Sequence, residues 1–150
     1  MDRIEFQWLK DYLELEEHIT FLKWNVNKTK LELIRWVEGD LSGVRLTRES
    51  RGARVEEVLA ALEDELSFTI EQKDSLLTLV EDGQEFNDCI LFKKYVEGKG
   101  LEVIAEELDC SSGRIRARHS EVTKKHSFIK EYQERIKKFK RGIEETESKL

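Results

Sequence analysis

The sequence predicts an all-α protein in which long coiled-coil-like helices precede a group of shorter helices and a C-terminal helix. Three observations support this prediction. The 150 residues include no proline, the residue that interrupts helix interiors. Apolar residues recur at heptad spacing near both ends of the chain, which is typical of packed helices. No stretch alternates apolar and polar residues in the manner of a half-buried strand.

The first expected helix covers residues 1–38 and carries an a/d heptad pattern that Thr29 alone interrupts. Such a seam packs either against another helix of the same chain or against a second chain, as in a dimer. Gly39 is expected to end this helix. The predicted oligomerisation residues are Trp8, Tyr12, Leu15, Ile19, Leu22, Val26, Leu33 and Trp36.

Residues 39–52 are expected to form a connector, because glycine and serine recur there. The arginines at 45, 48, 51 and 54 belong either to a solvated loop and helix start or to an arm that contacts phosphates. A second long helix is expected over 53–83. Thr69 and Lys73 fall on its apolar seam, which favours a bend or a split near residues 67–72.

Residues 84–126 contain the most informative pattern. A helical element over about 85–97 ends at Gly98-Lys99-Gly100, and helices are expected over 101–108 and 112–126. Ala105 allows two helices to cross closely, while Ile104, Leu108 and Ile115 supply apolar contacts between them. The turn needs left-handed backbone, which Asp109 tolerates better than most residues, and Ser111 or Ser112 can cap the next helix. This spacing is that of a DNA-binding helix-turn-helix.

The segments 90–98, 104–108 and 118–121 resemble the C-terminal helix-turn-helix region of sigma factors. The resemblance is closer to phage regulators of the ArpU and RinA kind and covers about residues 86–126. It implies a sequence-specific DNA-binding transcription regulator encoded by a phage or prophage. The chain departs from the family pattern at Asp109, a glycine in the family, at Gly113, and at Arg118, where an apolar residue is usual. Either His119 turns inward in place of Arg118, or Arg118 lies along the edge of the core.

The helical positions predict which side chains would face DNA. Residues early in the 112–126 helix would reach base edges and the flanking lysines would meet phosphates. The predicted DNA-binding residues are Ser112, Arg114, Arg116, Ala117, Arg118 and Ser120, with Lys99, Lys124 and Lys125 as phosphate contacts.

The C-terminal segment 127–150 is expected to form a basic helix with an apolar heptad seam. Val122 stands one heptad before Ile129, so this helix and the preceding one are expected to be nearly continuous. Its cations (Lys137, Lys138, Lys140 and Arg141) either extend the phosphate contacts or form a charged exterior.

The chain carries −6 overall, but residues 56–98 hold twelve acids and three bases, a charge of −9, whereas residues 110–141 hold eleven bases and three acids, a charge of +8.

Other classes of function find little support. No metal-ligand spacing, phosphate loop or nucleophile signature is present, so no cofactor, metal or enzyme activity is expected. Cys89 and Cys110 match no redox motif and are expected to be reduced in a cytoplasmic protein without a membrane span. The expected partners are double-stranded DNA and a second copy in a homodimer. Two alternatives remain open: a small-terminase-like DNA-packaging subunit, and a sigma-like module that docks on RNA polymerase or another regulator.

Overall fold

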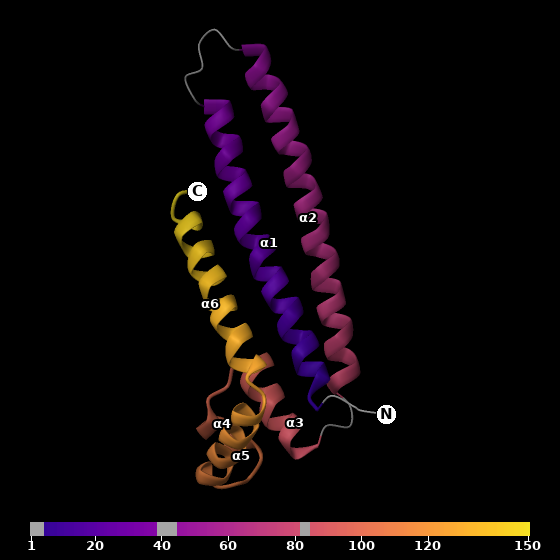
Figure 1. The fold of residues 1–150 in the computed structure, drawn as a ribbon, viewed down its shortest axis with the longest axis vertical. Coiled ribbons are helices and arrows are strands. Elements are labelled where there is room, and N and C mark those ends of the chain that lie inside the picture. Colours follow the sequence, from indigo (N-terminus) through magenta and orange to yellow (C-terminus); the bar gives the residue numbers. More distant parts are fainter. Residues whose placement is uncertain (1–4, 39–44, 82–84) are drawn as a thin grey trace. The chain divides into compact units, whose positions relative to one another are not determined.

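A computed structural model describes residues 5–38, 45–81 and 85–150, and within these ranges the chain is helical with no strand (Figure 1). The all-α prediction is therefore confirmed. The helices are α1 (Gln7–Glu38), α2 (Arg45–Glu81), α3 (Phe86–Leu91), the π-helical turn η1 (Phe92–Val96), α4 (Leu101–Glu107), α5 (Ser112–Lys125) and α6 (Phe128–Glu147). None of the described helices has the length and apolar character required to cross a membrane.

The chain divides into two compact units. The first unit comprises Met1–Glu14 and Asp74–Gln133, and the second comprises Leu15–Lys73 and Glu134–Leu150. The first unit contains the short helices α3 to α5, whereas the second consists of segments of α1, α2 and α6 only. Each unit is described separately below.

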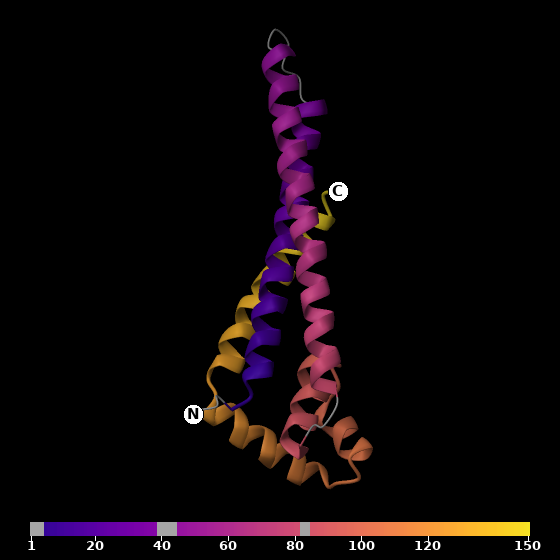
Figure 2. The same ribbon diagram turned by 90° about the vertical axis from the view of Figure 1, so that its right-hand side faces the viewer.

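In the second unit, α1 has α2 as an antiparallel neighbour and α6 as a parallel one (Figure 2). The Lys73 ammonium lies 3.0 Å from a Glu16 carboxylate oxygen, which joins α2 to α1. On the α6 side, the Phe139 ring packs against Phe21 and Trp24 with centroid distances of 5.5 and 5.8 Å. Aromatic pairs at these distances contribute beyond the area that they bury, so α6 is held to α1 through a small aromatic cluster.

Most heptad residues of α1 are buried or half-buried within the single chain. Tyr12, Ile19, Leu22 and Val26 are buried, and Trp8, Leu15 and Leu33 are half-buried. The polar position in the pattern, Thr29, is also buried, and its hydroxyl donates to the Asn25 carbonyl at 2.8 Å. The side chain of Trp36 lies outside the described residues. Dimer formation stays a prediction, but these side chains are already covered in a single chain.

Helix α2 differs from its prediction at both its start and its middle. It begins at Arg45 instead of near residue 53, because residues 45–51 are mostly good helix formers and a single glycine, Gly52, costs only about 1 kcal/mol. It also runs without the split expected near residues 67–72. Thr69 fits a helix interior because its hydroxyl donates to the Glu65 carbonyl at 2.7 Å.

Residues 39–44 of the connector and the side chains of its first three arginines lie outside the described residues; Arg54 is exposed.

The first unit is built around a compact apolar core. Ile90 of α3, Ile104 and Ala105 of α4, and Ile115 of α5 are all at least 96% buried, and Phe86, Leu101, Leu108 and Cys110 pack against them. The N-terminal turn of α1 belongs to this unit too, since the Trp8 indole donates to the Asp88 carboxylate at 3.0 Å. The helices are short, so their arrangement depends on this shared core.

The near-continuity expected between α5 and α6 is wrong. Helix α5 ends at Lys125, His126 leaves the helical conformation (φ −126°, ψ 80°), and α6 starts at Phe128. The His126 ring lies edge-on to both Phe6 and Phe128 at 5.3 and 5.9 Å. Val122 and Ile129 are each buried. The seven-residue spacing between them therefore relates two buried positions on separate helices, α5 and α6, and does not indicate one continuous helix.

Candidate nucleic-acid interface

Helices α4 and α5 are joined by a short turn whose geometry matches its sequence prediction. Asp109 has φ 54°, the left-handed conformation expected there. The Cys110 amide donates to the Ala105 carbonyl at 2.9 Å, which closes the end of α4. The Ser111 hydroxyl then accepts the Arg114 amide at 3.2 Å and caps α5. The turn fixes α5 against α4 with its N-terminal end exposed.

Helix α5 presents most of its predicted DNA-binding residues to solvent. Ile115 and Val122 form the buried face. Ser112, Arg114, Arg116, Ala117, Arg118, Lys124 and Lys125 are exposed, and Ser120 is half-buried. The residues named from the sequence thus share the outer surface of one short helix, which is a requirement for reading a DNA groove.

Three of the α5 cations have weak partners within the chain. The Arg116 guanidinium lies 2.9 Å from the Glu102 carboxylate, and Lys125 lies 3.3 Å from Glu121. Arg114 lies over the Phe86 ring, 4.8 Å from its centroid. Exposed pairs of this kind contribute roughly 0–1 kcal/mol, so a phosphate or a base edge could replace the carboxylates at little cost.

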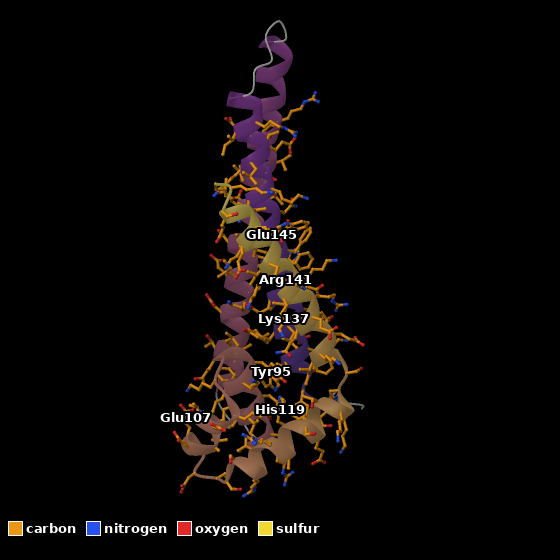
Figure 3. All side chains as sticks on the ribbon, turned by 90° about the vertical axis from the view of Figure 1, so that its left-hand side faces the viewer. Tyr95, Glu107, His119, Lys137, Arg141 and Glu145 are labelled. Carbon is orange, nitrogen blue, oxygen red and sulfur yellow. The ribbon has the colours of Figure 1, made fainter. Side chains whose placement is uncertain are left out.

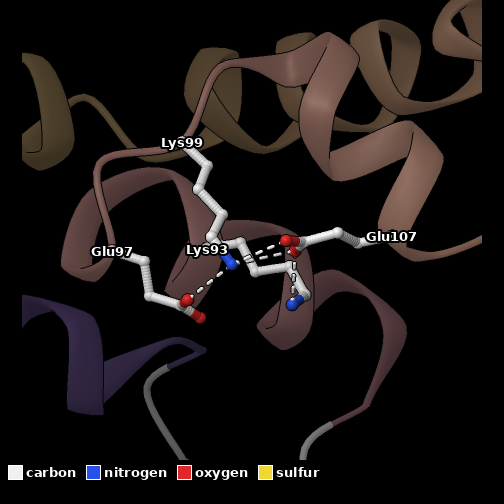
Figure 4. Close-up of polar contacts among 4 residues, drawn as sticks. All are labelled: Lys93, Glu97, Lys99 and Glu107. Atoms are coloured by element: carbon white, nitrogen blue, oxygen red, sulfur yellow. Dashed lines mark hydrogen bonds and ion pairs between the residues drawn. The ribbon is translucent and has the colours of Figure 1, made fainter.

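Lys99 has a role that the sequence did not predict. Its ammonium lies 2.7 Å from a Glu107 oxygen and 2.8 Å from a Glu97 oxygen, and Lys93 binds the same Glu107 carboxylate at 2.8 Å (Figure 4). Hydrogen bonds to Glu107 and Glu97 raise the pKa of Lys99, and those from Lys93 and Lys99 lower the pKa of Glu107. We call these four residues the Glu107 clamp. Lys99 is ion-paired within the clamp, and its place as a phosphate contact stays a prediction.

The departure at Arg118 is resolved by the inward turn of His119. Arg118 is exposed, whereas His119 is half-buried and its ring stacks on Tyr95 at 5.8 Å (Figure 3). The Tyr95 hydroxyl and His119 Nε2 are 2.6 Å apart. Burial raises the pKa of Tyr95 to about 12, and burial together with the nearby Lys94 charge lowers the pKa of His119. Tyr95 was not singled out from the sequence, because no motif marks its contact with residue 119.

The lowered pKa of His119 gives the first unit an expected pH dependence. The folded pKa of His119 lies below its unfolded value of about 6.5. The stability that neutral His119 contributes is therefore fully present above pH of about 6.5, and it is lost as the pH falls through the folded pKa. His119→Gln retains a hydrogen-bonding group beside Tyr95 but does not titrate. When the pH is lowered from about 7.5 to about 5, we expect the thermal unfolding temperature of wild type to fall further than that of His119→Gln.

The exposed His18, in the second unit, serves as the matched control. A His18→Gln variant should lose as much stability as wild type when the pH is lowered, and more than His119→Gln. Identical pH profiles for wild type and His119→Gln would contradict the assignment.

The described residues contain no group of three or more histidine, cysteine or acidic side chains placed to hold a metal ion. No disulfide joins Cys89 and Cys110. In the comparisons with known proteins, no family model, no curated protein and no solved structure matches the chain.

Proposed function

We propose that the protein is a sequence-specific DNA-binding transcription regulator that reads the major groove with α5. The observation that carries the proposal is the outer surface of α5, where arginines flank small residues. Gly113 and Ala117 are exposed. Arg114 and Arg116, which stand between them in the sequence, are exposed as well. Small residues allow the helix axis to approach base edges, while arginine can pair with guanine for roughly 1–3 kcal/mol of discrimination per contact.

The local charge supports the same proposal despite the net charge of −6. Helix α5 carries five cations and one acid, Glu121. What matters for DNA association is the field of the surface that meets the duplex, not the average over the chain. The core of Ile104, Ala105 and Ile115 fixes the orientation of α5, so these cations are presented together on a rigid element.

The test is selection from a mixture of genomic DNA fragments at two salt concentrations. Wild type is expected to retain a discrete fragment and to lose affinity steeply as salt rises, because bound cations release counterions from DNA. Arg114→Ala/Arg116→Ala is expected to lose the selection. Both side chains are exposed, so this variant should keep its helical content by circular dichroism.

The matched control removes two cations from another place. Lys30 and Arg35 are exposed on α1 in the second unit, and Lys30→Ala/Arg35→Ala should select the same fragment as wild type. If wild type shows no salt-dependent DNA binding, the proposal is wrong, and RNA polymerase or another regulator becomes the partner to test. Unchanged selection by Arg114→Ala/Arg116→Ala would exclude α5 as the reading helix.

A further inference from the structure

A second cationic surface lies on α6, within the second unit. Lys137, Lys138, Lys140 and Arg141 are all exposed and fall within five consecutive residues. We call them the α6 cationic surface. Figure 3 shows Lys137 and Arg141 one helical turn apart along the helix, with Glu145 a turn further.

The rotation of α6 about its axis is fixed by contacts on its opposite side. Ile136 is buried, and the Phe139 ring contacts Phe21 and Trp24. The Asn27 amide donates to the Thr146 hydroxyl at 3.1 Å. Because the helix cannot turn without breaking these contacts, its four cations are held on the solvent side.

These cations are not compensated within the described part of the chain. Two other basic residues of the second unit do have carboxylate partners: Lys73 lies 3.0 Å from Glu16 and Arg135 lies 3.1 Å from Glu17. Among the described residues no such ion pair forms at 137–141, although glutamates flank them on the same helix. Like charges three and four residues apart on a helix repel one another, and a bound polyanion would relieve the repulsion among these four cations.

We infer that the α6 cationic surface binds the phosphate backbone of duplex DNA without reading its sequence. This inference rests on the proposed function and names a second contact for the same ligand. Membrane-surface binding is disfavoured because an interfacial helix inserts an apolar face, and the apolar face of α6 is occupied by α1. Lysine and arginine contacts to phosphates add affinity and salt dependence but carry no sequence information.

The test compares the salt dependence of affinity for one short duplex of arbitrary sequence. In Lys137→Gln/Lys138→Gln/Lys140→Gln/Arg141→Gln, the slope of log affinity against log salt should shrink by about 0.9 for each phosphate that the variant no longer neutralises. Fragment selection should be unchanged, because α5 is untouched. The double variant Lys137→Gln/Arg141→Gln should give an intermediate slope, which guards against a folding defect in the fourfold variant.

The matched control removes four exposed cations elsewhere in the second unit, at Lys23, Lys30, Arg35 and Lys149. It should retain the wild-type slope. A wild-type slope in the α6 variant overturns the inference and leaves the proposed function standing, whereas absence of any wild-type DNA binding overturns both. Self-association of DNA-free wild type that the α6 substitutions abolish would also overturn the inference, since a second copy would then be the occupant.

Discussion

Ile115→Ala is expected to lower the free energy of unfolding of the first unit by roughly 2–5 kcal/mol, the usual cost of truncating a buried isoleucine. Ile115 is fully buried and belongs to the same core as Ile90, Ile104 and Ala105. The cavity would lie where α4 and α5 share this core with α3. The destabilisation should therefore reach α5 directly and weaken the proposed DNA binding as well.

Amide hydrogen exchange is the suitable measurement, because it follows α4 and α5 separately from the long helices. We expect faster exchange throughout α4 and α5 in Ile115→Ala. Val103→Ala is the matched control: Val103 lies on α4 but is 45% exposed, so its truncation should stay within about 0.5 kcal/mol. Equal protection in Ile115→Ala and wild type would show that the core does not hold these helices.

Gly142→Ala is expected to destabilise the second unit even though alanine is the better helix former. A Cβ at residue 142 would lie 2.8 Å from Cδ1 and Nε1 of Trp24, closer than carbon atoms approach in proteins. The Trp24 ring cannot move freely, since Phe139 lies 5.8 Å away and the Lys28 ammonium lies over it at 4.2 Å. Overpacking of this kind costs about 1–3 kcal/mol.

The matched substitution is Gly113→Ala, which removes a glycine from α5 with nothing within 4 Å of the new Cβ. That variant should gain up to about 1 kcal/mol from helix propensity and reduced unfolded-state entropy. Gly142 lies inside α6 and Gly113 in the first turn of α5, so the propensity gain at 142 is at least as large and the difference between the two variants is a lower bound on the clash. Denaturant unfolding followed by circular dichroism gives both values, and stabilisation of equal size in the two variants would contradict the close contact at Trp24.

The sequence predicted those parts of the fold that depend on local chemistry. The Asp109 turn, a serine cap at 111 or 112 and the apolar contacts of Ile104, Ala105 and Ile115 all follow from residue type and spacing, since each conformation or contact spans only a few residues. The start of α2 was missed because Gly52 was given more weight than its helix-forming neighbours. The break at His126 was missed because heptad spacing cannot distinguish one helix from two with neighbouring core positions.

The candidate interface was predicted only in part for a related reason. The exposed face of α5 follows from helical periodicity once Ile115 and Val122 are placed in the core. The Glu107 clamp and the Tyr95–His119 pair depend instead on how η1 meets α4 and α5. Residues 93 and 107, or 95 and 119, are brought together by tertiary packing, which has no repeating signal in the sequence.

The positions of two tryptophans make the chain its own optical probe. Trp8 belongs to the first unit, where its indole is bound to Asp88, and Trp24 belongs to the second, where its ring covers Gly142. Indole emission responds to the polarity around the ring, and the two rings have different surroundings. A chain in which Trp36 and one of these two tryptophans are replaced would therefore report the opening of a single unit, without any attached dye.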